Sequence, residues 1–286
     1  MKSSGKAACI LPHGVLFRGN AEADIREALI KSGYLKGIIG LPPNLFYGTG
    51  IAACIVVLDK ENAAARRGTF MIDASKGFRK DGAKNRLREQ DIHRIVDTFT
   101  RAADVPGYAR MVPHDEIADP KNAYNLNLPR YIDSTEAEDI QDIDAHLNGG
   151  IPVRDIDALA RWWKVMPSLR GQLLADLRPG YLSLTLPVAG VKAAIEGHAE
   201  FQAFTKAAGD VFAAWRTRTD AAPRAFGLNG HPKEFIEAVS EDLLEAFRKA
   251  PLVDAYDVYQ HLMDYWAETM QDDAYLIAAD GWVKGA

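Results

Sequence analysis

Short apolar runs, arranged in a fixed order in the first hundred residues, constrain the fold more than any other feature. Residues 7–11 (AACIL) are followed by a helical pattern at residues 21–31 and by a second run at residues 36–41 (KGIIGL). A third run, rich in β-branched residues, covers residues 51–58 (IAACIVVL), and a shorter fourth covers residues 69–73. Such runs are typical of buried strands. The order is therefore strand, helix, strand, loop, strand, strand.

The connections between these strands predict their directions. The first connection is a helix with Asn20 at its N-cap position and with Ala21, Ile25 and Leu29 on one face. A helix between two strands makes a crossover, so the first two strands are expected to be parallel. About ten residues without a helix join the second and third strands, which are therefore expected to be antiparallel. The pattern predicts one flank of an α/β sheet, with too few strands for a complete doubly wound one.

Beyond the fourth strand the chain changes in character. Residues 78–88 are predicted as a basic loop, residues 86–100 as a helix and residues 119–133 as a polar, extended segment. From about residue 136 the apolar spacing is helical. The clearest helices are predicted at residues 156–166, 191–215, 232–249 and 255–270.

An acidic segment marks the expected boundary between two domains. It contains EAEDIQDIDAHLNGG and ends in two glycines. Its acidic run, residues 136–144, is compatible with metal binding or with an exposed interdomain face, and the exposed face is favoured. We expect a domain at residues 1–133, a linker at residues 134–150 and a helical domain at residues 151–286.

The composition excludes several classes of protein. Of 286 residues, 48% are hydrophobic and 26% are charged, and the formal net charge of −5 argues against a protein that coats nucleic acid by bulk attraction. No run approaches the roughly eighteen apolar residues of a membrane-spanning helix, and no signal peptide is recognisable. Cys9 and Cys54 lie in apolar runs, which is typical of core residues in the reducing cytoplasm.

One glycine-rich segment resembles a dinucleotide-binding fingerprint. Gly48-x-Gly50-x-x-Ala53 has the relaxed spacing, and Asp73 stands twenty residues further on. The fingerprint requires a helix after the last glycine, so that its N-terminus meets phosphate. The residues that follow, CIVVL, are typical of a strand, so a glycine-rich loop between two strands is favoured. The sequence contains no Walker loop, H-E-x-x-H, C-x-x-C or G-x-S-x-G motif.

Five blocks, in order along the chain, resemble one family. They are GKAACILPHGVLFRGNAEADIREALI, IIGLPPNLFYGTGIAACIVVLDK, FMIDASKGFRKDGAKNRLREQDIHRIV, YNLNLPRYID and DVYQHLMDYWAETMQDDAYLI. The chain resembles the modification (M) subunit of type I restriction–modification systems, an adenine-N6 DNA methyltransferase. Five ordered blocks make a far more specific match than any single motif.

The resemblance also implies what the chain lacks. The family's cofactor loop, a G-T-G-G-like turn, and its N-P-P-F/Y tetrapeptide both lie N-terminal to the matching blocks. The only Pro-Pro pair here follows Leu41, whose side chain cannot accept hydrogen bonds from an adenine amine. Met1 is therefore expected to correspond to an interior point of an M subunit. The implied fold class is α/β: the second half of a Rossmann-like class I methyltransferase sheet, parallel with an antiparallel strand, followed by an α-helical C-terminal domain.

The resemblance implies that the loop at residues 42–50 helps to form the pocket for a flipped target base. Such a base needs an aromatic or apolar surface to stack on. Phe46 is the first candidate and Tyr47 the second, with Pro43 and Asn44 beside them. The alternative for either ring is that it plugs the end of the sheet.

The resemblance also favours nucleic-acid and partner contacts elsewhere. Cations beside glycine in the basic loop suit phosphate contact, although a solvated face is the alternative. In the last helix, Tyr256 and Tyr265 lie off the main apolar face and are candidate partner anchors, with core packing as the alternative. The candidate DNA-binding residues are Arg79, Lys80, Lys84, Arg86 and Arg88.

The function implied by the resemblance is S-adenosylmethionine-dependent methylation of adenine N6 in DNA. The implied partners are DNA, a specificity (S) subunit, a second M subunit and a restriction (R) subunit, in the cytoplasm and without a membrane. This chain alone is expected to be inactive, to bind no cofactor and to hold no catalytic residue or metal ligand. Two alternatives remain: a non-enzymatic module that binds DNA or a specificity-type subunit, and a nucleotide-dependent oxidoreductase that uses Gly48 and Gly50.

Overall fold

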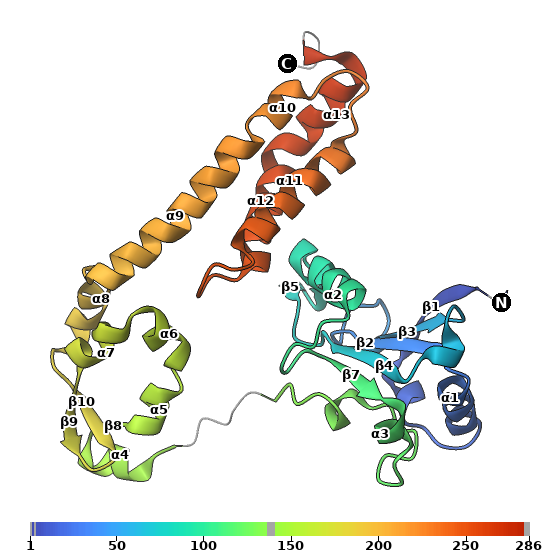
Figure 1. The fold of residues 1–286 in the computed structure, drawn as a ribbon, viewed down its shortest axis with the longest axis horizontal. Helices are drawn as coiled ribbons and strands as arrows, with labels where there is room; N and C mark the ends of the chain where they lie inside the picture. The colour runs from blue at the N-terminus through green and yellow to red at the C-terminus, as the bar shows by residue number, and fades with distance from the viewer. Residues whose placement is uncertain (1, 3, 136–140, 283–286) are drawn as a thin grey trace. The chain divides into compact units, whose positions relative to one another are not determined.

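The computed structural model describes residue 2, residues 4–135 and residues 141–282 (Figure 1). The chain divides into two compact units, residues 1–137 and residues 138–286. Each unit has apolar clusters of its own, so the two are described separately. Within the expected linker, helix α4 (Ile143–Asn148) is formed, while residues 136–140 lie outside the described residues.

The first unit is built on a five-stranded sheet with the strand order β1-β3-β2-β4-β7. β2 and β4 pair in parallel, whereas the other three pairs are antiparallel. The expected α/β class, with a sheet of parallel and antiparallel strands and helical regions, is thereby confirmed. The strands are β1 (Lys6–Pro12), β2 (Leu35–Gly40), β3 (Ala53–Asp59), β4 (Gly68–Asp73) and β7 (Ala109–Pro113).

The predicted strand directions are confirmed, but the neighbours differ. β2 and β3 are antiparallel, as their short connection predicted. β1 and β2 run in the same direction, since each is antiparallel to β3, yet β3 lies between them. The crossover helix therefore carries the chain past one strand position, which the later strand β3 fills.

Helical layers cover the two faces of the sheet. On β2, successive side chains point to opposite faces, so Ile38 joins one apolar cluster and Ile39 the other. The Ile38 cluster lies with Ile30 of helix α1 (Ala21–Lys31), and the Ile39 cluster lies with Ile95 of helix α2 (Glu89–Arg101). Short helices η1 (His13–Leu16), η2 (Ala63–Ala65), α3 (His114–Ala118) and η3 (Leu128–Arg130) complete the unit.

Helix α1 has the predicted bounds but not the predicted cap. Asn20 occupies the N-cap position with φ of 56°, and its side chain makes no capping hydrogen bond. Its backbone carbonyl instead accepts from the N–H of Ala23 at 2.9 Å. The positive φ at Asn20 turns the chain into the helix.

Two segments differ from the predicted loops. The basic loop is a two-stranded hairpin, β5 (Arg79–Asp81) and β6 (Lys84–Arg86). The polar segment at residues 119–133 is not merely extended, because it turns into η3 and buries Leu126, Leu128 and Ile132 in the core. Apolar residues at two-residue spacing in this segment were the signal for that burial.

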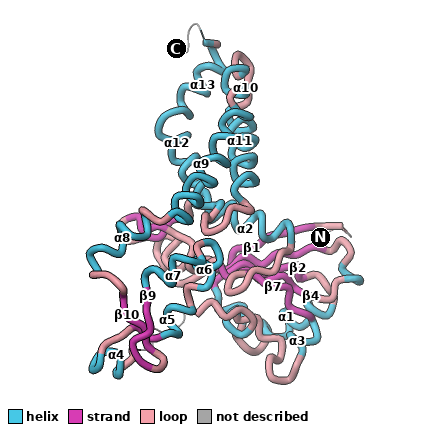
Figure 2. Tube along the Cα trace, turned by 60° about the vertical axis from the view of Figure 1, so that its left-hand side comes forward, coloured by secondary structure: helices cyan, strands magenta, loops and turns pink. Residues whose placement is uncertain are grey.

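The second unit contains a small sheet that the helical pattern did not predict. Strands β8 (Ile151–Pro152), β9 (Leu174–Arg178) and β10 (Tyr181–Leu184) pair in the order β8-β10-β9. Figure 2 shows β9 and β10 in magenta. Its helices are also more broken than predicted. Besides α4, the helices are α5 (Val153–Asp157), α6 (Ala160–Val165), α7 (Pro167–Leu173), α8 (Val188–Glu196), α9 (Ala199–Thr219), α10 (Ala221–Ala225), α11 (Pro232–Phe247), α12 (Ala255–Tyr265), the π-helix η4 (Trp266–Met270) and α13 (Gln271–Asp280).

The long helices of this unit pack on one another through aromatic side chains. Trp215 of α9 and Phe247 of α11 share one buried cluster, and Trp266 packs with Ile236 in another. Figure 1 shows α11, α12 and α13 side by side. No helix among the described residues combines the length and the apolarity needed to cross a membrane.

Candidate functional site

Residues 42–50, here called the aromatic loop, connect β2 to β3. Pro42 is fully buried, and Leu45 packs against the apolar cluster beneath helix α2. Phe46 is 39% exposed and Tyr47 is 94% exposed. Leu45 thus packs into the apolar core, Phe46 is partly exposed, and Tyr47 stands almost wholly in solvent.

The backbone of the loop is folded tightly at two points. Asn44 adopts a left-handed backbone with φ of 59°, and Gly48 has φ of +79°. A Cβ at Gly50 would lie 3.0 Å from the side-chain oxygen of Asn44, so glycine there allows the two limbs of the loop to approach. The glycines thus shape a loop between two strands.

The hairpin formed by residues 79–86 holds the first limb of the aromatic loop. The backbone N–H of Asn85 donates to the carbonyl of Asn44 at 3.0 Å. The side-chain Nδ2 of Asn85 donates to the carbonyl of Pro43 at 2.7 Å. Asn85 is only 4% exposed, so both hydrogen bonds are shielded from water.

Lys84 holds the tip of the same loop. Its Nζ donates to the carbonyl of Phe46 at 2.7 Å and to the carbonyl of Thr49 at 3.1 Å. The residues predicted as a base pocket and the residues predicted as a phosphate-binding loop therefore form one continuous surface.

The five predicted cations have different surroundings in the structure. Arg79, Lys80 and Arg86 are exposed on the hairpin, with Lys80 Nζ 5.5 Å from the Phe78 ring centroid. Arg88 pairs with Asp91 at 2.9 Å.

The Arg88 pair caps helix α2, because Asp91 also accepts from the backbone N–H of Arg88. The amine of Lys84 lies against the carbonyls of Phe46 and Thr49. Lys84 and Arg88 thus have partners within the chain, which the predicted basic loop did not include.

Polar side chains also gather where β1 and β4 end; the sequence interpretation named Asp73 but not its neighbours His13 and Ser134. Asp73 is the last residue of β4 and accepts from the hydroxyl of Ser134 at 2.6 Å. His13 directly follows β1, and burial lowers the pKa of its imidazole, with the charge of Asp73 acting in the opposite direction. A polar residue directly after a predicted strand was the available signal, since the carboxyl ends of such strands carry functional groups in α/β sheets.

The oxidoreductase alternative is removed by the geometry after Gly50. The chain continues into β3, not into a helix. No helix N-terminus is therefore available to receive a phosphate at this loop. The same argument shows that the glycine pair does not fit S-adenosylmethionine, because a cofactor loop of this type also precedes a helix.

One side of the sheet is open. Among the described residues β1 pairs only with β3, and on β1 Ile10 is 58% exposed and Leu11 37% exposed. Beside Leu11 lies an apolar groove of about 200 Å³, lined also by Ile25 and Leu29 of α1 and by Val56. The apolar surface of β1 is thus left in solvent.

The match to a family model concerns this first unit. The family model described as N-6 DNA Methylase matches residues 1–140. Residues 1–140 are therefore similar to the N-6 DNA methylase family. The resemblance inferred from the sequence blocks is confirmed, and residues 1–137 are called the methylase unit below.

The curated relatives are methylase subunits of type I restriction enzymes. The MjaVII subunit of Methanocaldococcus jannaschii is 36% identical over 143 residues, covering 49% of this chain and 24% of the relative. The MpnII subunit of Mycoplasma pneumoniae is 34% identical over 139 residues, covering 49% and 25%. This chain spans about a quarter of the length of these curated relatives.

Among solved structures, the type I restriction-modification methyltransferase subunit of Streptococcus thermophilus is 39% identical. The match has a TM-score of 0.43 and covers 46% of this chain and 27% of that chain.

The predicted partner anchors lie in the second unit. Tyr265 is exposed at the end of α12, and Tyr256 is half-buried near its start, where its backbone N–H donates to Asp254. Tyr259, between them, is buried. The helix thus turns one tyrosine inward and presents Tyr265 outward.

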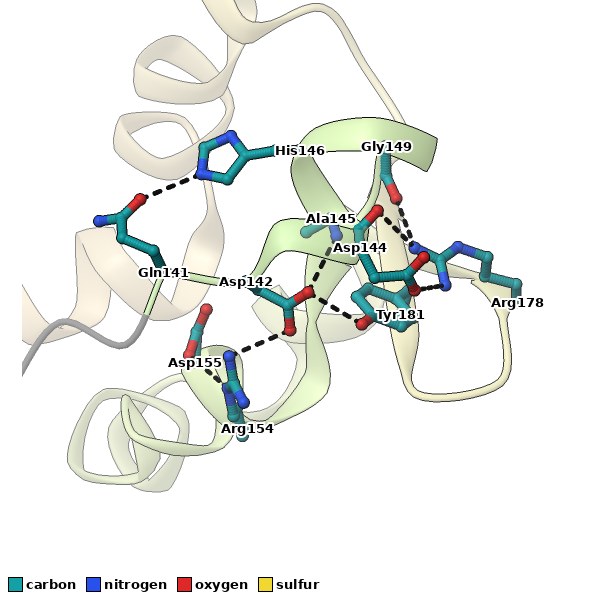
Figure 3. A network of polar contacts seen from close by, with 10 residues as sticks. All are labelled: Gln141, Asp142, Asp144, Ala145, His146, Gly149, Arg154, Asp155, Arg178 and Tyr181. Carbon is teal, nitrogen blue, oxygen red and sulfur yellow. Dashed lines mark hydrogen bonds and ion pairs between the residues drawn. The ribbon is translucent and has the colours of Figure 1, made fainter.

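The acidic segment forms a structural network in the described residues (Figure 3). Asp142 accepts from the backbone N–H of Ala145, from the hydroxyl of Tyr181 at 3.0 Å and from Arg154 at 3.0 Å. These contacts, led by the Ala145 N–H, lower the pKa of Asp142. Within the described part of the chain, no group of three or more metal-ligating side chains is found.

Arg178 completes this network. Its guanidinium lies 3.5 Å from the ring centroid of Tyr181 and donates to Asp144 at 2.5 Å and to the carbonyl of Gly149 at 3.0 Å. The network ties α4 to the small sheet, so these acidic side chains serve the fold of the second unit.

Proposed function

We propose that this chain supplies one half of the catalytic sheet of a type I modification methylase. The observation that carries the proposal is the open edge at β1, where Ile10 and Leu11 lie in solvent although they have the character of core residues. An exposed apolar edge strand is a surface for pairing with another strand. In the proposal, a strand from the part of the methylase that contains the cofactor loop pairs there.

The reaction of the assembled enzyme is proposed to be methyl transfer to the N6 atom of adenine in DNA. The target base must leave the duplex for this chemistry, and it then needs a flat apolar surface. The exposed rings of Phe46 and Tyr47 at the tip of the aromatic loop suit that role. Pro43 and Asn44 form the limb that supports the tip.

Phosphate contact is assigned in this proposal mainly to the exposed cations of the hairpin. Arg79, Lys80 and Arg86 extend into solvent beside the aromatic loop. Cations at such a position anchor the DNA backbone without reading its sequence. Lys84 and Arg88 are secondary candidates, because both are half-buried against their partners. Arg86, in contrast, pairs with the exposed Asp81 at 3.8 Å.

S-adenosylmethionine is the proposed methyl donor of the assembled enzyme. Because this sequence lacks both the G-T-G-G-like turn and the N-P-P-F/Y tetrapeptide, we expect the isolated chain neither to bind the donor nor to methylate DNA. Calorimetric titration with S-adenosylmethionine checks this expectation, and micromolar binding would contradict it.

The helical unit is proposed to contact other subunits of a restriction–modification complex. Candidates are a specificity subunit, a second modification subunit and a restriction subunit, with Tyr265 as the exposed anchor and Tyr256 as the second. Large aromatic side chains that stand in solvent commonly anchor protein interfaces.

Co-expression tests the proposal as a whole. The complementary N-terminal portion of a type I methylase subunit, such as that of Streptococcus thermophilus, would be produced with this chain and a specificity subunit. We expect copurification, protection of the exposed Cys9 on β1 from alkylation, and methylation that blocks restriction of the DNA. Copurification without Cys9 protection would place the contact elsewhere, and a complex that binds DNA without methylating it would favour a non-enzymatic binding module.

A further inference from the structure

The tip of the aromatic loop is closed by a side chain from a different segment. The carbonyls of Phe46 and Thr49 flank the two tip residues, Tyr47 and Gly48, and the ammonium group of Lys84 lies against both carbonyls. A lysine ammonium has three donors, so two loop carbonyls can be satisfied by one group. The tip is therefore shaped by Lys84 as well as by its own backbone.

The neighbouring residue of the hairpin fixes the other limb. Asn85 reaches the carbonyls of Asn44 and Pro43 with its backbone N–H and its side chain. Buried hydrogen bonds of this kind are costly to break, because water does not readily replace the lost partner. Four of the nine loop residues thus have their carbonyls held by two successive hairpin residues.

From these contacts we infer that Lys84 and Asn85 are positioning residues, which fix the aromatic loop so that Phe46 and Tyr47 present their rings in one orientation. This inference rests on the proposed function of the loop in receiving a flipped base. A stacking surface held in place before the base arrives avoids the entropy loss of ordering a nine-residue loop on binding.

The inference assigns Lys84 a role different from that of its neighbours in the hairpin. Lys80 stands in solvent near the Phe78 ring, whereas Lys84 is half-buried against the loop. Loss of Lys80 should weaken DNA binding and lower its salt dependence. Loss of Lys84 should instead release the loop tip.

The experiment uses chymotrypsin, which cleaves after exposed aromatic residues, on the full chain without DNA or cofactor. Cleavage after Tyr47 is followed by mass spectrometry. We expect Lys84→Met and Asn85→Asp to speed this cleavage about five- to tenfold, the effect of losing one or two hydrogen bonds. Lys84→Arg, which can still donate to both carbonyls, should restore slow cleavage, and Lys80→Met should leave the rate unchanged.

Intact folding of each variant is checked by the thiol of Cys54, which is buried in the wild-type core and must stay unreactive. Equal cleavage rates in Lys84→Met and Lys80→Met would overturn the inference, whatever the loop's function. A weaker salt dependence of DNA binding in Lys84→Met, with unchanged cleavage, would identify Lys84 as a phosphate contact.

A second readout concerns the base itself. In the complemented enzyme, DNA that carries 2-aminopurine at the target position should show a smaller fluorescence change on binding with Lys84→Met than with wild type, because the flipped base is held less often. Faster cleavage with an unchanged fluorescence signal would support the positioning role of Lys84. It would contradict the proposed function of the loop in receiving the base.

Discussion

Ile10 on β1 lies directly opposite Ile55 on β3, yet only Ile55 is packed against the core. Opposite residues of an antiparallel pair share one face of the sheet. The same face is therefore covered at Ile55 and bare at Ile10. The difference arises because the helical layer over that face, centred on α2, covers the middle strands of the sheet.

Substitution of Ile10 separates stability from assembly. We expect Ile10→Lys to change the free energy of unfolding of the isolated chain by no more than about 0.5 kcal/mol, because the side chain is exposed. The same change should abolish copurification with the complementary methylase portion. Ile55→Ala is the matched control and should cost about 2 kcal/mol. Undiminished copurification of Ile10→Lys would contradict pairing at β1.

The two cysteines should differ sharply in reactivity. Burial raises the pKa of the Cys54 thiol to about 11, so only about one thiol in a thousand is ionised at pH 8. Cys9 is exposed on β1. A thiol reagent at pH 8, followed by mass spectrometry, should modify Cys9 within minutes and Cys54 only when the methylase unit unfolds. Similar rates at both sites would show that the sheet opens readily.

Asp59 should make the methylase unit sensitive to acid. Burial alone would raise the pKa of its carboxyl, but hydrogen bonds from Lys36 at 3.1 Å and from the backbone N–H of Glu61, with the charge of Lys6, hold the pKa below its ordinary value. A carboxyl with a lowered folded-state pKa stabilises the fold above its unfolded pKa. That stabilisation is lost as the pH falls through the folded value.

We therefore expect Asp59→Asn to lower the free energy of unfolding by about 2 kcal/mol at pH 7, and by less at pH 3, which lies below the ordinary pKa of an aspartate. Urea unfolding, read at the β3 peptide by pulsed hydrogen exchange, measures both values. Asp81→Asn, on the exposed hairpin, is the control and should have little effect at either pH. A loss for Asp59→Asn that is equally large at pH 3 would exclude the charge as its source.

The network around Arg178 should stabilise the second unit. Arg178→Lys keeps the positive charge but loses the planar fork and much of the stacking on Tyr181. The thermal midpoint of this unit should fall, and tryptophan emission reports it selectively, because all five tryptophans lie beyond residue 160. Arg224→Lys, which alters an exposed pair with Asp220, should leave the midpoint unchanged. Equal midpoints for the two variants would assign the network no role in stability.

Much of the sheet could be predicted because apolar runs and connection lengths are local signals. Residues 36–41 and 51–58 were predicted within two residues of β2 and β3, and their antiparallel pairing followed from the short loop between them. The position of β3 between β1 and β2 could not be predicted in this way. Strand order depends on contacts between segments that are distant in sequence, and the spacing of apolar residues carries no information about such contacts.

The second unit was predicted less well because its strands are short and weakly apolar. β9 has the sequence LADLR and is mostly exposed, so it lacks the alternation typical of a half-buried strand. The helix predicted at residues 191–215 is divided at Gly197, and His198 caps the helix that follows by accepting from the N–H of Glu200. Because the apolar spacing continues across this break, the spacing alone predicts one uninterrupted helix.

The site was predicted in its parts but not in its connections. The aromatic pair in the loop and the cations at residues 79–88 were both visible in the sequence. The contacts that join them, from Lys84 to Phe46 and Thr49, link residues 35 to 38 positions apart. The distinction between a lysine that holds a loop and a lysine that stands in solvent therefore needed the structure.

The bare strand β1 has a consequence for any cell that makes this polypeptide. The unpaired backbone N–H and C=O groups on the outer edge of β1, beside apolar side chains, can pair with the same strand of a second copy and so start aggregation. Lys6 and Pro12 stand at the two ends of the strand, where a charge and an imide nitrogen act as gatekeepers against such growth. We expect solubility to fall when both are replaced by valine, and expression together with a strand-donating companion to restore it.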